Sequence, residues 1–416
     1  AHFGEVFARG GFDLVVGNPP WVRAEVLPPR LRQELTRRYR WWGGNGGSGF
    51  SHQADLAIAF LERSLELAAP GGTVGLLVPA KVATSAYAAR ARTALSTQFT
   101  VRVVADLGRD ADAVFDASAY PLALIVTKAR PSATDQVQGS LTTTGPGVPV
   151  SSLAATGPWV IAGAHVDQVL RAIRRRSGVL ADHAPPQLGV KTGDNRAFLD
   201  PPDHLPADCV RVALRGREVG QFTIRPKHRL LWTHGADGRP LPTLPPPVEA
   251  YLAPWRTRLE QRADRRVGAW WQLFRVRAAF ARYRVVWPDL ARRLTAAPLV
   301  DRPEVIPLNS CYVASVSSPA RSLALTSWFN SELIRVVAAL GADPAMNGFA
   351  RFNARSVGQL PWPDAAHSDR VLIRSAEQGS LGEDTTAALE ARVSDLLGLD
   401  AHDRRALLGA GAHHRC

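Results

Sequence analysis

The sequence predicts an α/β fold in which a partial doubly wound sheet is followed by an α+β domain and a helical carboxyl-terminal segment. Three observations predict it. Apolar strand-type segments alternate with amphipathic helical segments up to residue 130, the composition then shifts to Ser, Thr, Gly and Pro, and a helical pattern returns near the end. Strands that alternate with helices are typical of a mostly parallel sheet with helices on its faces.

The expected elements of the first part follow in order. We expect strands over 12–16, 73–78, 101–107 and 122–127, helices over 53–68 and about 85–98, and a loop over 108–121. Leu56, Phe60 and Leu67 recur at helical spacing, and Pro70-Gly71-Gly72 follows them as a stop signal. The apolar run TVGLLV then has the length and composition of a buried strand.

Beyond residue 130 the sequence predicts three further segments: a linker at 131–163, a second domain at 164–363 and a helical segment at 364–416. The linker is poor in periodic patterns, and the second domain is rich in proline and arginine. The run Arg174, Arg175 and Arg176 lies on an expected helix and is the densest of these basic clusters.

Composition limits the class of protein. With 416 residues, 46% hydrophobic and 21% charged, the chain suits two or three globular domains. A net charge of +13 indicates a polyanionic partner, nucleic acid first and a membrane surface second. No apolar window is long enough to span a membrane and no signal pattern begins the chain, so we expect a cytoplasmic protein. The three cysteines are far apart, and neither a disulfide framework nor a metal site is expected.

The stretch GFDLVVGNPPWVRAE carries the clearest chemical signal. An apolar strand ends in Asn18, Pro19, Pro20 and Trp21, and two prolines fix φ and remove two backbone donors. The chain therefore leaves the strand as a stiff loop at the carboxyl edge of the sheet, where doubly wound folds bind ligands.

Such a loop suits group transfer to a planar amine. The side-chain oxygen of Asn18 and the carbonyl of Pro19 can accept both protons of an exocyclic amine, which localises its lone pair on nitrogen. Trp21 can stack on the base, and the prolines hold the acceptors in place beforehand. A base of a duplex reaches such a pocket only by flipping out of the stack.

These residues resemble the catalytic motif of the γ-class adenine-specific DNA methyltransferases, particularly the large enzymes of restriction-modification and phage-defence systems. The segments QADLAIAFLERSLELAAPGGTVGLLVPA and DADAVFDASAYPLALIV are similar to regions that follow this motif, and Phe115 stands where the family carries an aromatic that sandwiches the flipped base. The segments LGVKTGDNRAFL and SLALTSWFNSELIRVVAAL resemble parts of the recognition domain. The family more often has Tyr or Phe where this chain has Trp21.

The resemblance implies a function for each segment. Residues 1–130 would be the carboxyl-terminal half of the catalytic domain, and residues 164–363 a target recognition domain that binds double-stranded DNA. Lys191 and Asn195 would join the arginine run in DNA contact. S-adenosylmethionine would be the methyl donor, its glycine-rich binding motif is expected upstream of residue 1, and we expect this chain to be a fragment that is inactive alone.

Two other functions fit the same residues. Enzymes that methylate a protein glutamine or an RNA guanine amine also present Asn-Pro-Pro-aromatic to a planar amine. A catalytically inactive DNA-recognition subunit could keep the fold without the activity.

Overall fold

The structure is a computed structural model, which describes residues 3–42, 54–107, 120–141, 147–153, 158–159, 164–265, 267–345, 348–380 and 382–412. The chain divides into two compact units. Unit 1 comprises Ala1–Arg171, Leu340–Ala350 and Arg405–Cys416, and unit 2 comprises Ala172–Ala339 and Arg351–Arg404. The first passage between the units falls inside helix α7 (Ala164–Arg176), not in the segment 131–163 that the composition suggested.

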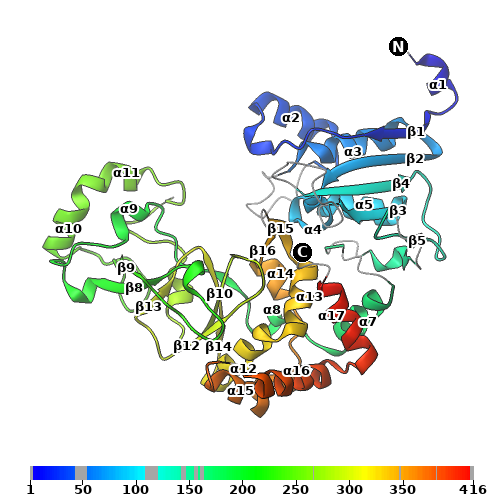
Figure 1. Cartoon of the computed structure of the whole chain (residues 1–416). Coiled ribbons are helices and arrows are strands. Elements are labelled where there is room, and N and C mark those ends of the chain that lie inside the picture. Colours follow the sequence, from blue (N-terminus) through cyan, green and yellow to red (C-terminus); the bar gives the residue numbers. More distant parts are fainter. Residues whose placement is uncertain are drawn as a thin grey trace. The chain divides into compact units, whose positions relative to one another are not determined.

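Unit 1 contains a four-stranded sheet in the order β1, β2, β4, β3 (Figure 1). The strands are β1 (Phe12–Gly17), β2 (Ala68–Pro79), β3 (Thr100–Asp106) and β4 (Pro121–Thr127). β1 pairs with β2 in parallel, whereas β4 pairs antiparallel with both β2 and β3. Thus β1, β2 and β3 share one direction, as a mostly parallel sheet requires, and β4 is a reversed strand inserted between two of them.

Helices connect the strands that share a direction, because such strands need a crossover. The helices of this part are α1 (Gly4–Ala8), α2 (Pro29–Arg38), α3 (Leu56–Leu67), α4 (Lys81–Thr84) and α5 (Ala89–Gln98), with single 3₁₀ turns at Ala24–Val26 and Ala86–Ala88. The helix expected over 85–98 begins properly only at Ala89, because Ser85 has an extended backbone that ends α4. The α3 helix begins after Asp55, whose side chain accepts a hydrogen bond from the Ala57 amide.

One face of this sheet is buried against α3 and α5. Buried residues alternate with half-buried ones along β2 and β4, as the period-2 geometry of a strand requires. The buried face and the two helices form one hydrophobic cluster, which includes Ile58, Leu61, Leu65, Val74, Leu76, Val78, Ala91, Leu95, Leu122, Leu124 and Val126. β1 lies at the edge, where Leu14 and Val16 are exposed.

The segment expected to be a linker contributes to this core. It contains the short paired strands β5 (Gln136–Val137) and β6 (Val148–Pro149) and a 3₁₀ turn at Val150–Ser152. Val137, Leu153 and Trp159 are buried in the same cluster as the sheet. The backbone amide of Trp159 donates to the Ala83 carbonyl at 2.8 Å. The low periodicity of the sequence therefore did not exclude core residues from this segment.

Unit 2 combines small sheets with helices, as an α+β domain does. One sheet has the order β12-β10-β14-β7 and another the order β13-β8-β9. Their strands are β7 (Gln187–Leu188), β8 (Val210–Leu214), β9 (His228–Leu231), β10 (Tyr283–Pro288), β12 (Ala297–Val300), β13 (Val305–Pro307) and β14 (Cys311–Val316). A further short strand of unit 2 is β11 (Leu290–Ala291). The short strand β15 (Asp343–Ala345) belongs to unit 1, and β16 (Phe349–Arg351) includes the boundary between the units at residue 350.

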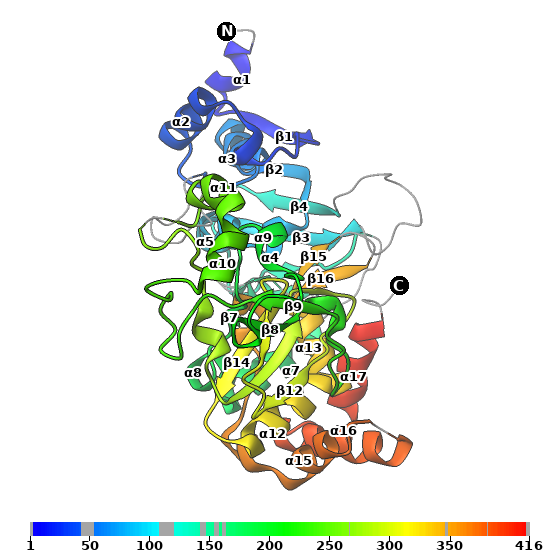
Figure 2. The same ribbon diagram turned by 90° about the vertical axis from the view of Figure 1, so that its left-hand side faces the viewer.

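The helices of the second half are short near its start and long near the carboxyl terminus. They are α8 (Leu180–His183), α9 (Asn195–Phe198), α10 (Pro246–Leu252), α11 (Arg256–Glu260), α12 (Pro319–Asn330), α13 (Glu332–Gly341), α14 (Ala354–Gly358), α15 (Arg370–Glu377), α16 (Glu383–Leu397) and α17 (Ala401–Ala412). Helix α12 lies beside α15 (Figures 1 and 2). Within the described ranges no single helix is long and apolar enough to cross a membrane, although the bent pair of α12 and α13 passes that test jointly.

Several arginines of unit 2 are structural. Arg262, Arg284 and Arg335 are buried and donate to backbone carbonyls, and burial lowers the pKa of each to about 10. Arg284, for example, donates to the carbonyls of Ala279, Val305 and Arg302. These cations satisfy buried carbonyls and are not exposed for a polyanion, so the arginine density of the sequence overstates the surface charge.

His234 makes the stability of the chain depend on pH. Burial lowers its pKa to about 4, against the opposing effects of the Asp237 charge and a backbone hydrogen bond of Leu273. The folded chain therefore keeps this ring neutral where the unfolded chain protonates it, below about pH 6.5. Its contribution to stability is complete above that value and is lost as the pH falls towards 4.

We predict that between pH 7.5 and pH 5 the wild-type chain loses about 2 kcal/mol of unfolding free energy that a His234→Gln variant does not lose. Urea unfolding of both proteins at the two pH values measures this difference. An equal loss in both proteins would show that His234 is not the group responsible.

Candidate functional site

The loop after β1 is held at both ends. β1 precedes it, and behind it the amide of Ala24 donates to the Ala54 carbonyl at 2.7 Å while the amide of Leu56 donates to the Val22 carbonyl at 2.8 Å. These bonds form a bridge between Arg23 and Asp55, immediately before α3. The stiffness expected from two prolines is therefore reinforced by tertiary contacts.

The four motif residues differ in exposure. Asn18 and Pro20 are exposed, Pro19 is buried and Trp21 is half-buried. The indole nitrogen of Trp21 donates to the Leu77 carbonyl near the end of β2 at 3.2 Å, and the ring packs against the core of unit 1. Among the described residues no group hydrogen-bonds to the Asn18 amide. At the carboxyl end of β1 the loop thus presents the side-chain amide of Asn18, which is free to bind a ligand, beside the anchored indole of Trp21.

Asp55 is a site residue that the sequence reasoning did not select. It is buried, it caps α3, and it lies in the bridge that closes the motif loop. Burial raises the pKa of its carboxyl group, against the lowering effects of the Ala57 amide and of the Arg23 and Lys81 charges. The available signal was an aspartate directly before an apolar helical pattern, which marks a helix start.

The aromatic expected to sandwich the base, Phe115, lies outside the described residues. The loop Asn18–Trp21 contains no carboxylate of the kind that holds a cofactor ribose in nucleotide-binding folds. Its amide, carbonyl and indole suit a neutral planar base, so no residue of this loop is assigned to S-adenosylmethionine.

The basic run on α7 is divided in its roles. Arg174, Arg175 and Arg176 are all exposed in the last turn of α7. Arg176 donates to the carbonyl of Gly398 at 2.9 Å, at the left-handed residue that ends α16. Arg174 and Arg175 have no such partner among the described residues. Two of the three charges are therefore available to a ligand, and the third caps a neighbouring helix.

Lys191 and Asn195 flank a tight turn. Gly193 has a φ of +73°, and a side chain there would meet Arg262. Lys191 forms an ion pair with Asp264 at 2.5 Å, and the side-chain oxygen of Asn195 accepts from the Thr192 hydroxyl at 2.7 Å. The turn is therefore well ordered, and Lys191 is already neutralised within unit 2.

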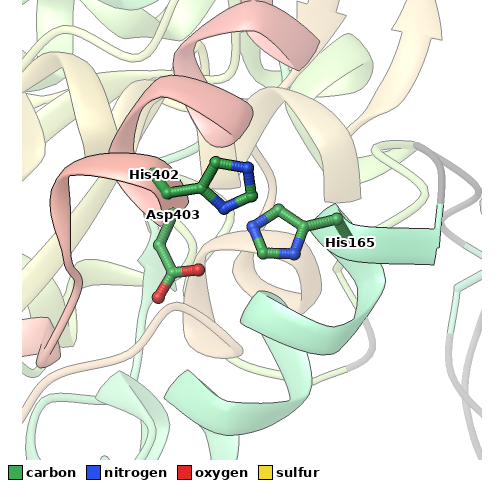
Figure 3. Close-up of side chains that lie close together, drawn as sticks. All are labelled: His165, His402 and Asp403. Atoms are coloured by element: carbon green, nitrogen blue, oxygen red, sulfur yellow. The ribbon is translucent and has the colours of Figure 1, made fainter.

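In two groups of His and Asp side chains the possible metal-binding atoms lie within 4.8 Å of one another. Figure 3 shows His165 on α7 and His402 and Asp403 at the start of α17; the first belongs to unit 1 and the others to unit 2. In unit 2, Asp364 lies 3.9 Å from His183 and 3.8 Å from His367. Ligands of a tetrahedral zinc ion lie about 3.3 Å apart, so this second group is wider than a bound site.

Comparison with known proteins identifies the first part of the chain. Residues 1–115 match the family model described as Eco57I restriction-modification methylase. The Type II methyltransferase M.PaeR7I of Pseudomonas aeruginosa is 26% identical over 97% of this chain and 73% of its own length. The Type II methyltransferase M.XhoI of Xanthomonas vasicola is 30% identical over 29% of this chain and 20% of its own length.

Among solved structures, the Type IIL restriction-modification enzyme MmeI, determined in complex with DNA, superposes with a TM-score of 0.61 at 13% identity. The match covers 95% of this chain but only 56% of MmeI, so the chain spans little more than half of that enzyme. This similarity shows a shared fold.

The match over residues 1–115 places the motif loop in a segment of the restriction-modification methylase class. More particularly, residues 1–115 carry an Eco57I-type methylase segment, and the chain is a homologue of Type II methyltransferases. The identification as a restriction-modification methyltransferase, made from Asn18 to Trp21, is confirmed at this level.

Proposed function

We propose that the full-length protein transfers a methyl group from S-adenosylmethionine to the N6 atom of adenine at a specific site in double-stranded DNA. The observation that carries this proposal is the loop after β1, where Asn18 is exposed, has no hydrogen-bond partner among the described residues and precedes the anchored Trp21. The names of the relatives and the restriction-modification family model support the reaction class. The choice of adenine rests on the motif residues.

The roles of these residues follow from their chemistry. The oxygen of Asn18 and the carbonyl of Pro19 would accept the two N–H groups of adenine, which concentrates the nitrogen lone pair for attack. N6 would gain the methyl carbon as the sulfur of the donor leaves, and N6 would then lose one proton. When bound, S-adenosylmethionine supplies the methyl group; the residues of this chain act on the acceptor.

Trp21 would hold the flipped base by stacking. Its N–H bond to Leu77 fixes the plane of the indole before any ligand binds, so little conformational entropy is lost on binding. Protein glutamine and RNA guanine remain chemically possible acceptors, but no observation favours them over DNA. The basic surface of α7 and the named relatives both favour DNA.

Replacing Asn18 tests the catalytic assignment. We predict that Asn18→Ala lowers adenine methylation by the full-length protein by about a hundredfold or more, because loss of one oriented polar partner in a transition state has costs of that order. Duplex affinity should stay within about twofold, since the described residues make no contact that the change removes. Nucleoside mass spectrometry and fluorescence anisotropy measure the two quantities.

The matched control for this experiment is Gln33→Ala, which removes an exposed amide from α2 of the same unit. It should leave both quantities unchanged. Equal losses of binding and methylation in Asn18→Ala would mean that Asn18 supports the structure and not the reaction.

Replacing Trp21 separates stacking from anchoring. We predict that Trp21→Ala lowers kcat/KM by roughly 5- to 150-fold, the equivalent of about 1–3 kcal/mol for one stacked base. Trp21→Phe should retain most of the activity, because it keeps a ring and loses only the bond to Leu77. Fluorescence of 2-aminopurine at the target position reports the flipped base, and normal turnover in Trp21→Ala would remove this residue from the site.

The arginines of α7 provide a test of duplex binding. We predict that replacing Arg174 and Arg175 by Gln weakens binding to all sequences and reduces the slope of log affinity against log salt by up to about 2. Arg176→Gln is the matched control, because this guanidinium already caps α16. A slope that stays constant in the double variant would place the phosphate contacts elsewhere.

A further inference from the structure

Unit 2 contains an open cleft of about 380 Å³. It lies between the start of α9, the turn that follows β8 and the turn between β13 and β14. Its lining consists of Asn195, Arg215, Gly216, Arg217, Leu308, Asn309 and Ser310. The lining has two cations, two amides and one hydroxyl but no carboxylate, so the cleft suits a ligand rich in hydrogen-bond acceptors.

The turn that carries the two arginines is fixed by its backbone. The amide of Gly216 donates to the Ser310 hydroxyl at 3.0 Å, and the amide of Arg215 donates to the buried carboxylate of Glu218 at 2.9 Å. A Cβ atom on Gly216 would lie 2.5 Å from the Ser310 carbonyl oxygen, so only glycine fits there. The backbone positions of both arginines are therefore fixed before a ligand binds.

The guanidinium of Arg217 is exposed and yet oriented. Its Nη2 atom lies 3.1 Å from Nε2 of His228, and Nδ1 of His228 lies 2.8 Å from Oδ2 of Asp200. A guanidinium can only donate, so Nε2 accepts in the contact with Arg217, and the proton between the ring and Asp200 is on Nδ1. The buried Oε1 atom of Glu218 lies 3.6 Å from the same Nε2 atom. Asp200, His228 and Arg217 thus form a relay that fixes the plane of the guanidinium.

Asp200 is itself held in an unusual conformation. Its φ is +50°, a region that a residue with a side chain rarely adopts. The Arg229 amide donates to its carboxylate at 2.9 Å, and its own amide donates to the Arg229 carbonyl at 2.9 Å. Strain of this kind persists where the surroundings enforce it and is often found at functional positions.

A fixed, planar donor fork matches two neighbouring acceptors, which either a phosphate or the O6 and N7 atoms of guanine can offer. The amides of Asn195 and Asn309 distinguish these ligands. An amide both donates and accepts, and phosphate oxygens offer only acceptors, whereas base edges offer both donors and acceptors. The mixed lining therefore favours the edge of a G·C pair, in which O6 and N7 of guanine accept and the N4 amino group of cytosine donates.

We propose that Arg217 reads a guanine of the recognition sequence through its major-groove edge, and that His228 and Asp200 are positioning residues for it. This inference rests on the proposed function, because it assumes a DNA site that is read by base contacts. It assigns one base contact to a named side chain of unit 2.

The test is a selection of bound duplexes from a randomised DNA pool by the full-length protein. Wild-type protein should select a motif that contains a G·C pair at the position read by Arg217. Arg217→Ala should select the same motif with preference at that one position reduced by about 5- to 150-fold, the range for one bidentate contact. His228→Ala should reduce preference at the same position by a smaller factor, since the fork remains but is no longer oriented.

Arg239→Ala is the matched control, because Arg239 is an exposed arginine of unit 2 outside the cleft lining. It should leave the motif unchanged, and affinity for unrelated duplexes should be equal in all variants if they are folded. An unchanged motif in Arg217→Ala would overturn the proposal. A uniform loss at all positions with a smaller salt slope would also overturn it, because that result identifies a phosphate contact.

The selection depends on binding alone, so it separates this proposal from the methylation chemistry. If the wild-type protein selects a motif but does not methylate it, the proposed reaction is contradicted. The proposed role of Arg217 is unaffected by that result. A wild-type protein that selects no motif would overturn the role of Arg217.

Discussion

The parallel pairing of β1 with β2 is the constraint on which the candidate site depends. Where β1 and β2 begin, the two backbone segments approach so closely that a Cβ atom on Gly11 would lie 2.5 Å from the Leu67 carbonyl oxygen. At its end the Trp21 indole is bonded to Leu77 of the neighbouring strand. β2 therefore fixes both the origin of β1 and the point from which Asn18 leaves the sheet, so the motif loop needs few contacts of its own.

Much of unit 1 could be predicted from local sequence, because strand and helix periods and the proline pair are local properties. The direction of β4 could not, since the direction of a strand depends on which neighbours it pairs with. Likewise, the sequence counts Arg176 and Arg284 among the basic residues, but only packing shows that one caps α16 and the other satisfies buried carbonyls. The sequence from 131 to 159 lacks a periodic pattern, yet Val137, Val150, Leu153 and Trp159 pack in the core.

The two candidate DNA-contacting regions of unit 2 differ in how they are built. Arg174 and Arg175 are solvated charges at a helix end, where flexible side chains can follow a phosphate backbone without a defined geometry. The cleft at Arg217 depends instead on a glycine that permits no side chain, on Asp200 with its positive φ, and on the imidazole of His228 that Asp200 orients. The first arrangement suits affinity for any DNA sequence, and the second suits discrimination between bases. Only the first can be recognised in the sequence, because its arginines are consecutive.

The passages of the chain between the two units constrain how such a protein can evolve. Unit 1 is assembled from three stretches of chain and unit 2 from two, and three of the four passages, at residues 171, 339 and 404, fall within continuous helices. A recombination event with a single crossover would join parts of unit 2 from different parents. Exchange of unit 2 as a whole would have to replace 172–339 and 351–404 together. If the proposed role of the cleft is right, new sequence specificities should arise more readily by point substitutions at cleft positions than by exchange of all of unit 2.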